Sequence, residues 1–320
     1  MADIDVFNGD ADGICALIQL RNADPRQSRL VTGLKRDIAL VDRADAASGD
    51  RITVLDVSFD TNRQGVQKAL EAGAEIFYVD HHFAGEIPRN ERLTTIIDTD
   101  PDVCTSLLVN GHLRGRYAHW AVTGAFGDNL KASAQAIARP LGLTEKQLEL
   151  LESLGIYINY NGYGSSLDDL HFDPAALFEL ARPYATPLAF VEEAPDIFAE
   201  LEGGYRADMA AAAAIEPERE TRKTAAFILP NEAWARRVSG VYSNDLANAF
   251  PQRAHAVLTE RADGTYLVSV RAPLANKRGA DELCRRFPTG GGRGAAAGIN
   301  ALPGDQLDAF MNSFAASYDS

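Results

Sequence analysis

The sequence predicts an α/β protein in which a parallel-sheet domain, with helices on both faces, precedes a smaller α+β domain. Short β-branched runs at 4–7, 52–57, 76–79 and 95–97 alternate with helical patterns at 13–20 and 61–72, an order typical of a parallel sheet. The runs are continuously apolar, as expected for strands that helices cover on both sides. Beyond about residue 221 the pattern changes, which indicates a second domain.

The remaining elements fix the expected domain boundaries. Residues 105 to about 209 are mostly helical, with a polar, aromatic interruption at 157–164 (YINYNGYG). After an Ala-rich and then charged connecting segment, we expect strands at 224–229, 254–258 and 266–270 and helices at 232–249 and 279–287. The Asp263-Gly264 pair is a common hairpin turn between two of these strands. The predicted domains are 1–200 and 221–320, with a linker at 201–220.

Composition limits the classes of function. The 320 residues are 46% apolar and 24% charged, which excludes global disorder and a fibrous repeat. Thirty-one Lys and Arg against 45 Asp and Glu give a net charge of −14. So acidic a surface disfavours long duplex nucleic acid and anionic membranes as partners. A small phosphorylated ligand or the end of a short strand remains compatible with this charge.

The cysteines and the N-terminal residues indicate the cellular compartment in which we expect the protein. Cys15, Cys104 and Cys284 are odd in number and far apart, so they form neither a disulfide framework nor a zinc motif. The first residues, MADIDVFNGDADG, lack the basic and apolar regions of a signal peptide, and no run reaches the ~18 apolar residues of a membrane span. We expect reduced thiols, a cytoplasmic location and no membrane partner. A homodimer is compatible with the sequence.

Acidic residues and histidines follow several of the predicted strands. These are Asp10 and Asp12 (NGDADG), Asp56 (ITVLD), Asp80, His81 and His82 (IFYVDHH), and Asp128 after a helical stretch (GAFGDN). The carboxyl ends of parallel strands share one edge, where ligands bind. A single Asp in such a place is more often a helix N-cap, but the coincidence of the set favours a common site.

Carboxylates brought this close need protonation or a cation. Oxygen ligands mixed with imidazole suit Mn²⁺ or Mg²⁺, and Zn²⁺ less well. Such an ion can acidify a bound water and polarise a phosphoryl oxygen.

The motifs GDADG, VLDVS, VDHH and GAFGDN resemble, in order, the four motifs of the DHH phosphoesterase superfamily. The stretch VSVRAP, followed by GADELCRRFPTGGGRGAAAG, resembles the DHHA1 domain that accompanies it. The superfamily includes RecJ-like exonucleases, short-oligonucleotide (nano-RNA) nucleases, cyclic-dinucleotide phosphodiesterases and phosphoanhydride-cleaving relatives. The resemblance implies a two-domain, Mn²⁺-dependent phosphoester hydrolase with its site in the cleft between the domains.

The resemblance also implies roles for individual residues. Asp12, Asp56, His81 and Asp128 should hold one ion, and Asp10 and Asp56 a second, with Asp56 bridging. His82 should face the substrate phosphate or support the site.

The first motif departs from the superfamily. Val6 stands where the superfamily usually has a histidine. We therefore expect one or two ions, the second more weakly bound, with the Asn8 amide as a substitute ligand.

A basic, glycine-rich stretch provides the candidate substrate-binding residues. Between Arg271 and Arg293 lie six basic and two acidic residues, next to the run Gly290, Gly291 and Gly292. Backbone N–H groups of glycines can converge on phosphate, and arginine binds phosphate bidentately. A glycine run alone is often just a flexible turn. Arg293 follows the glycines where the superfamily has histidine, which favours binding over proton donation because arginine does not deprotonate.

The predicted function is hydrolysis of phosphodiester bonds in short oligonucleotides or small, including cyclic, nucleotides by metal-activated water. The alternatives are a pyrophosphatase or polyphosphatase-like hydrolase and a catalytically weak nucleotide-binding sensor. Thr105 and Ser106 begin a helix after the sheet. Two roles are open for them: they cap that helix, or the helix start binds phosphate.

Overall fold

The computed structural model describes residues 1–318 and divides into two units. The first is Met1–Glu202 and the second begins at Gly203. The division falls inside helix α9 (Pro195–Ala213), so the chain is helical where the units meet in sequence. Each unit has its own sheet.

The first unit is built on five parallel strands in the order β2-β1-β3-β4-β5. They are β1 (Asp3–Phe7), β2 (Ser28–Val31), β3 (Arg51–Leu55), β4 (Glu75–Asp80) and β5 (Leu93–Ile97). The predicted parallel sheet is confirmed. Strand β2 was not predicted because SRLV is short, half of its residues are polar and only Val31 is buried.

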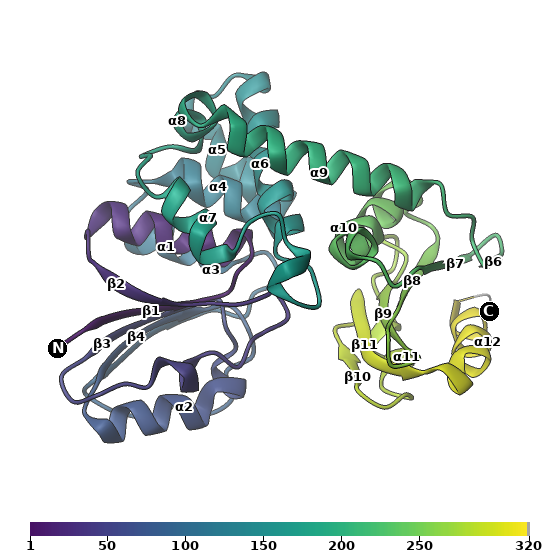
Figure 1. The fold of residues 1–320 in the computed structure, drawn as a ribbon, viewed down its shortest axis with the longest axis horizontal. Helices are drawn as coiled ribbons and strands as arrows, with labels where there is room; N and C mark the ends of the chain where they lie inside the picture. Colours follow the sequence, from purple (N-terminus) through teal and green to yellow (C-terminus); the bar gives the residue numbers. More distant parts are fainter. Residues whose placement is uncertain (319–320) are drawn as a thin grey trace. The chain divides into compact units, whose positions relative to one another are not determined.

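Helices cover both faces of this sheet (Figure 1). On one face lie α2 (Phe59–Ala72) and the short 3₁₀ turn η1 (Val41–Ala44), which share an apolar core with inward residues of the strands such as Val54 and Tyr78. The other helical layer contains α1 (Ala11–Ala23), α3 (Thr105–His112), α4 (Ala118–Gly127), α5 (Lys131–Ala138), η2 (Arg139–Leu141), α6 (Glu145–Asn161), η3 (Leu167–Asp169), α7 (Pro174–Ala181) and α8 (Pro187–Glu193).

Helix α6 corrects one expectation from the sequence. The interruption expected from residue 157 onward begins later, because α6 continues to Asn161 after a capping box at Thr144. Tyr157 and Tyr160 are buried, with the Tyr160 hydroxyl 2.8 Å from Nε2 of His171. Most of the polar and aromatic residues of this segment therefore belong to the last turns of a packed helix.

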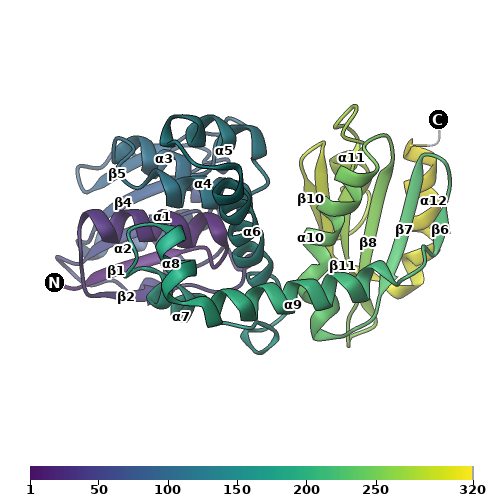
Figure 2. The same ribbon diagram turned by 90° about the horizontal axis from the view of Figure 1, so that it is seen from above.

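The second unit contains a mixed six-stranded sheet in the order β10-β11-β9-β8-β7-β6. Its strands are β6 (Arg219–Glu220), β7 (Thr224–Leu229), β8 (Ala254–Glu260), β9 (Thr265–Arg271), β10 (Gly290–Gly292) and β11 (Ala296–Pro303). Among the strands that the structure describes in this sheet, only β7 and β8 pair in parallel. Helix α10 (Ala233–Ala249) packs on one face, where Phe227 meets Tyr242. Helices α11 (Ala280–Cys284) and α12 (Leu307–Tyr318), with η4 (Gly304–Gln306) before the latter, share the core of the other face (Figure 2).

The C-terminal part departs from the sequence expectation in two ways. The helix expected at 279–287 is confined to Ala280–Cys284. The residues after it form two paired strands, β10 and β11. The sequence did not predict them, because this segment is rich in glycine and alanine, which are weak strand formers. The three cysteines are buried free thiols. Among residues 1–318, no helix combines the length and apolar character needed to cross a bilayer.

Candidate metal centre at the carboxyl edge of the sheet

The acidic residues of the first unit gather where the parallel strands end. Asp10 and Asp12 follow β1, Asp56 follows β3, and His81 follows β4. These four side chains are almost fully buried, and Asp128, at the C-cap of α4, joins them partly exposed. The structure therefore brings the predicted residues of the first unit to one edge.

His81 points one ring nitrogen into this cluster. Its Nδ1 lies 2.9 Å from the backbone oxygen of Val103, and a carbonyl can only accept, so Nδ1 carries the proton. Nε2 lies 3.4 Å from Oδ1 of Asp56 and 3.9 Å from Oδ2 of Asp128. This is how proteins usually orient a metal-ligating imidazole.

Asp12 is fixed by the start of helix α3. Its two carboxylate oxygens accept hydrogen bonds from the backbone N–H groups of Thr105 and Ser106, both at 2.7 Å. The Ser106 hydroxyl donates to the backbone oxygen of Asp12 at 2.8 Å. The helix start therefore binds a carboxylate of the chain itself, and each Asp12 oxygen keeps a second lone pair for another partner.

His82 is held by an acid that the sequence analysis noticed but did not include in the site. Its Nδ1 lies 2.7 Å from Oδ1 of Asp80, a fully buried carboxylate that also accepts from the Phe59 N–H at 3.3 Å. The rings of His81 and His82 are 4.5 Å apart. Asp80 therefore sets the orientation of His82.

Two groups of residues among 1–318 have ligand atoms close enough to share an ion. They are Asp56 with His81 and His82, and Asp12 with His81 and Asp128; within each group the ligand atoms lie within 4.8 Å of one another. Carboxylate oxygens with one or two imidazoles match the ligand preference of Mn²⁺. The residues present fit a divalent ion.

The electrostatics of the cluster favour the same conclusion. Burial, and then the charges of Asp10, Asp12 and Asp128, raise the pKa of Asp56 well above its ordinary value. Burial also raises the pKa of Asp128. Excess negative charge in a buried place raises carboxyl pKa values in this way, and a bound cation would relieve it.

The backbone at Asp56 is itself unusual. Its φ of 58° lies in the left-handed region, which is uncommon for residues other than glycine, although Asp and Asn adopt it more often than most. The Asp56 N–H donates to the Val79 oxygen at 3.1 Å, so the turn is tied to the next strand. Strained residues of this kind concentrate at functional sites.

A lysine that the sequence analysis missed lies inside the cluster. The Lys35 ammonium pairs with Oδ2 of Asp10, donates to Oδ1 of Asn159 at 2.8 Å and lies 3.7 Å from Oδ1 of Asp128. Burial acts to raise the pKa of Asp10, but the Lys35 charge together with the hydrogen bonds from Lys35 and from the Gly13 N–H outweighs it, so the pKa is lowered. Lys35 is in no motif and follows the unpredicted strand β2, so the sequence carried no signal for it.

Apart from His82, the candidate substrate-binding residues belong to the second unit. Arg271 ends β9 and its Nε donates to Oδ1 of Asn244 at 2.7 Å. Ala296 is paired with Arg271 across the sheet, and its backbone exchanges hydrogen bonds with the exposed Arg293. The two arginines thus lie at the same end of this sheet. Their expected position across a cleft from the acidic cluster stays a prediction.

The glycine run is a strand. Gly290–Gly292 form the edge strand β10, with Gly291 opposite Gly298 of β11. A Cβ on Gly290 would meet the Cys284 oxygen at 1.8 Å, and Gly292 has a φ of 135°. Packing therefore accounts for two of the three glycines, while Gly291 has open space around its Cα.

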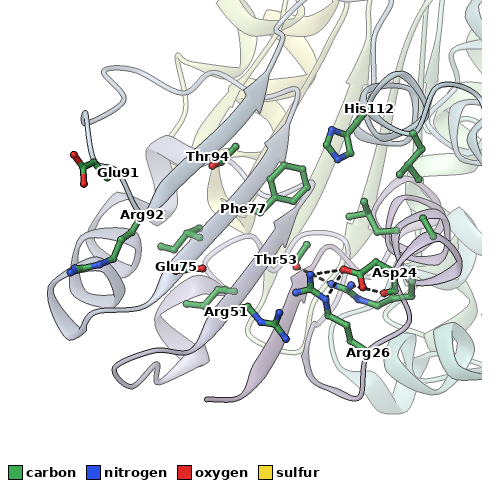
Figure 3. Close-up of a pocket in the computed structure, with 16 residues that line it drawn as sticks. Asp24, Arg26, Arg51, Thr53, Glu75, Phe77, Glu91, Arg92, Thr94 and His112 are labelled. Atoms are coloured by element: carbon green, nitrogen blue, oxygen red, sulfur yellow. Dashed lines mark hydrogen bonds and ion pairs between the residues drawn. The ribbon is translucent and has the colours of Figure 1, made fainter.

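The first unit also has a cavity of about 440 Å³, with Arg51, Thr53, Glu75 and Phe77 among the residues that line it (Figure 3). It is lined by the beginnings of β3 and β4 and the end of α1, so it belongs to the opposite edge of the sheet. Its charged residues are largely paired: Arg26 with Asp24, and Arg51 with Asp3 at 2.8 Å. We assign no part of the acidic site to it.

Solved structures share this fold. A DHH-domain protein described as a member of a family of ribosomal proteins superposes with a TM-score of 0.69 at 14% identity, covering 98% of this chain and 86% of its own. Exonuclease RecJ bound to manganese gives 0.61 at 19% identity, covering 98% and 89%. A pGpG-specific phosphodiesterase, PggH from Vibrio cholerae, gives 0.57 at 15% identity, covering 99% and 100%. No protein-family profile and no curated protein sequence matches. The chain has the two-domain fold of DHH-domain proteins, as the sequence motifs predicted.

Proposed function

We propose that the chain is a divalent-metal-dependent phosphoesterase that hydrolyses phosphodiester bonds of short oligonucleotides or small nucleotides. The observation that carries the proposal is the convergence of Asp12, Asp56, His81 and Asp128 on one buried edge of the sheet. Two proteins of the same fold support it by their descriptions, an exonuclease bound to manganese and a pGpG phosphodiesterase.

In this proposal the four residues hold the ion, which supplies a Lewis acid that polarises a phosphoryl oxygen and acidifies a water molecule. Val103 keeps the His81 lone pair on Nε2, facing the carboxylates. Asp80 holds His82 at the partly exposed side of the cluster, where the ring can contact a substrate phosphate. Arg271, Arg293 and the glycines of β10 bind the distal phosphate or terminal nucleotide.

The test is a hydrolysis assay with Mn²⁺ and, separately, Mg²⁺ on four substrates: pGpG, a short single-stranded RNA, a cyclic dinucleotide and inorganic polyphosphate. We expect release of mononucleotide from at least one of the first three, no turnover after chelation, and loss of turnover in Asp12→Asn. Asp42→Asn, which changes an exposed carboxylate paired with Lys68, is the matched control.

Two results would contradict the proposal. Cleavage of polyphosphate alone would place the chain among phosphoanhydride hydrolases. Tight nucleotide binding without product over hours at saturating Mn²⁺ would make it a sensor.

A further inference from the structure

Lys35 lies inside the acidic cluster at the place where the resemblance to DHH proteins implies a second ion. We propose that its ammonium group permanently replaces that ion, so that the chain binds one divalent cation and uses Lys35 as the second positive charge. This inference rests on the proposed function and specifies how its site is built.

The coordination of Asp10 is the first argument. Oδ1 of Asp10 accepts from the Gly13 N–H at 3.0 Å as the N-cap of α1, and Oδ2 is paired with Lys35. Both oxygens therefore have partners within the chain, and the partner of Oδ2 is itself a cation, unlike the backbone N–H groups that hold Asp12. Asp10 is also absent from both groups of residues that could share an ion among residues 1–318.

The position of Lys35 is fixed by hydrogen bonds of its backbone. The Lys35 N–H donates to the Gly162 oxygen at 2.8 Å, and its carbonyl accepts from Nδ2 of Asn8 at 3.3 Å. The segment passes so close to Gly9 that a Cβ there would meet the Gly33 oxygen at 1.9 Å. The residue is thus anchored from two sides and is not a surface lysine that happens to fold inward.

The surroundings of the implied second ion also disfavour a cation there. Val6, at the position of the superfamily histidine, is fully buried in the apolar core and offers no ligand atom. Asn8 uses its amide nitrogen to hold the Lys35 backbone. Its oxygen has no hydrogen-bond partner within residues 1–318 and is free to contact a cation, so Val6 and the Lys35 charge, not Asn8, disfavour a second ion. A cation bound by Asp10 would stand in contact with the ammonium group, and like charges repel strongly in a buried place.

Lys35 is suited to more than neutralising Asp10. It lies 3.7 Å from Oδ1 of Asp128, whose other oxygen faces His81. The ammonium group is therefore adjacent to the proposed ion and can stabilise negative charge that develops on a phosphoryl oxygen. Lysine serves this role as a compact point charge.

The test is the number of Mn²⁺ ions bound per chain, measured by calorimetric titration and by elemental analysis after gel filtration, with electron paramagnetic resonance to detect coupled ion pairs. The wild-type chain should bind one ion and show no coupled signal. Lys35→Ala releases Asp10 and opens space beside Asp56, so its stoichiometry should rise toward two. Lys68→Ala, which removes an exposed lysine outside the site, should behave as wild type. If Lys35→Ala does not fold, Lys35→Met, which also removes the charge but keeps most of the side-chain volume, is measured in its place.

Two ions on the wild-type chain, or one ion on both wild type and the Lys35 variant, would overturn the assignment. These outcomes are separate from those of the proposed function. A chain that binds one ion but hydrolyses no phosphoester leaves the inference standing and rejects the function. A chain that binds two ions and hydrolyses a nucleotide rejects the inference about Lys35 and supports the proposed function.

Discussion

At the scale of single residues, the metal centre is a set of carboxylates that repel one another and are held together by the fold. Asp56 is the extreme case, because it is buried, has a raised pKa and adopts a left-handed backbone conformation. Such a residue lowers the stability of the ion-free protein. Natural sites commonly trade stability for function in this way.

This trade predicts opposite effects of Asp56→Asn on activity and stability. Asparagine tolerates the left-handed backbone and removes one buried charge, so the ion-free variant should be more stable by about 1–2 kcal/mol. Loss of the ligand should eliminate turnover and weaken Mn²⁺ binding. Urea unfolding in the presence of chelator, together with the hydrolysis assay, checks both effects. A variant that is less stable without metal would argue against charge repulsion at this position.

Asp80 offers a test of positioning. Asp80→Asn removes the carboxylate that orients His82, a member of the group with Asp56 and His81. The group of Asp12, His81 and Asp128 does not include His82. We expect kcat to fall by about 10–100-fold, the usual effect of losing such an orienting partner, with one Mn²⁺ still bound. Loss of the ion would instead assign Asp80 to metal binding.

Residues of the site differ in how far the sequence revealed them. Acids at strand ends share an edge by the geometry of a parallel sheet, so Asp10, Asp12 and Asp56 could be grouped from the order of motifs along the chain. Lys35 and Asn159 could not, because they come from a loop and from α6, and Asn159 lies 124 positions from Lys35. Only packing brings such residues together.

At the scale of elements, substitutions in strand β10 can distinguish a structural role of its glycines from a role in binding phosphate. Gly290→Ala should destabilise the second unit, because its Cβ would clash with the Cys284 backbone. Gly291→Ala has open space and should leave stability within about 0.5 kcal/mol of wild type. If β10 binds phosphate through a close backbone approach, Gly291→Ala should still raise KM. An unchanged KM would limit the glycines to a structural role.

Strand β8 contains a pH-sensitive residue. His255 is 1% exposed, neither ring nitrogen has a hydrogen-bond partner within residues 1–318, and burial, followed by the nearby Arg253 charge, lowers its pKa to about 4; Glu220 opposes this shift. Between pH 6.5 and 4 the unfolded chain therefore binds more protons than the folded one, and stability falls as the pH falls.

The expected loss over this range is about 3 kcal/mol. Trp234 is the tryptophan of the second unit and Trp120 that of the first, so a Trp120→Phe background reports the second unit by fluorescence during urea unfolding. His255→Leu should flatten the pH dependence. An equally steep dependence in that variant would show that another group is responsible.

Elements were predicted where apolar periodicity was strong. Strands β1, β3, β4, β7, β8 and β9 have runs of buried apolar residues, and helix α2 ends at Gly73 with a φ of 92°, as its C-cap position indicated. Strands β2 and β10 are short edge strands with few buried side chains. Edge strands of this kind form by hydrogen bonding to a neighbouring strand, so their own sequences carry little apolar pattern from which to predict them.

At the scale of the whole molecule, the net charge of −14 and the buried carboxylates imply that cation binding and folding are linked. A ligand that binds only the folded state adds about 2.7 kcal/mol at a hundred times its dissociation constant. Mn²⁺ should stabilise the first unit by this amount at that concentration, followed through Trp120 in a Trp234→Phe background. Equal stabilisation of the second unit would indicate a nonspecific effect of the cation.

The most direct test of the metal centre is a crystal grown with Mn²⁺ and measured at the manganese absorption edge. The account predicts one anomalous peak in the first unit, within coordination distance of Asp12, Asp56, His81 and Asp128, with Lys35 still on Asp10. An absent peak at these residues, or a second peak at the Lys35 position, would contradict it.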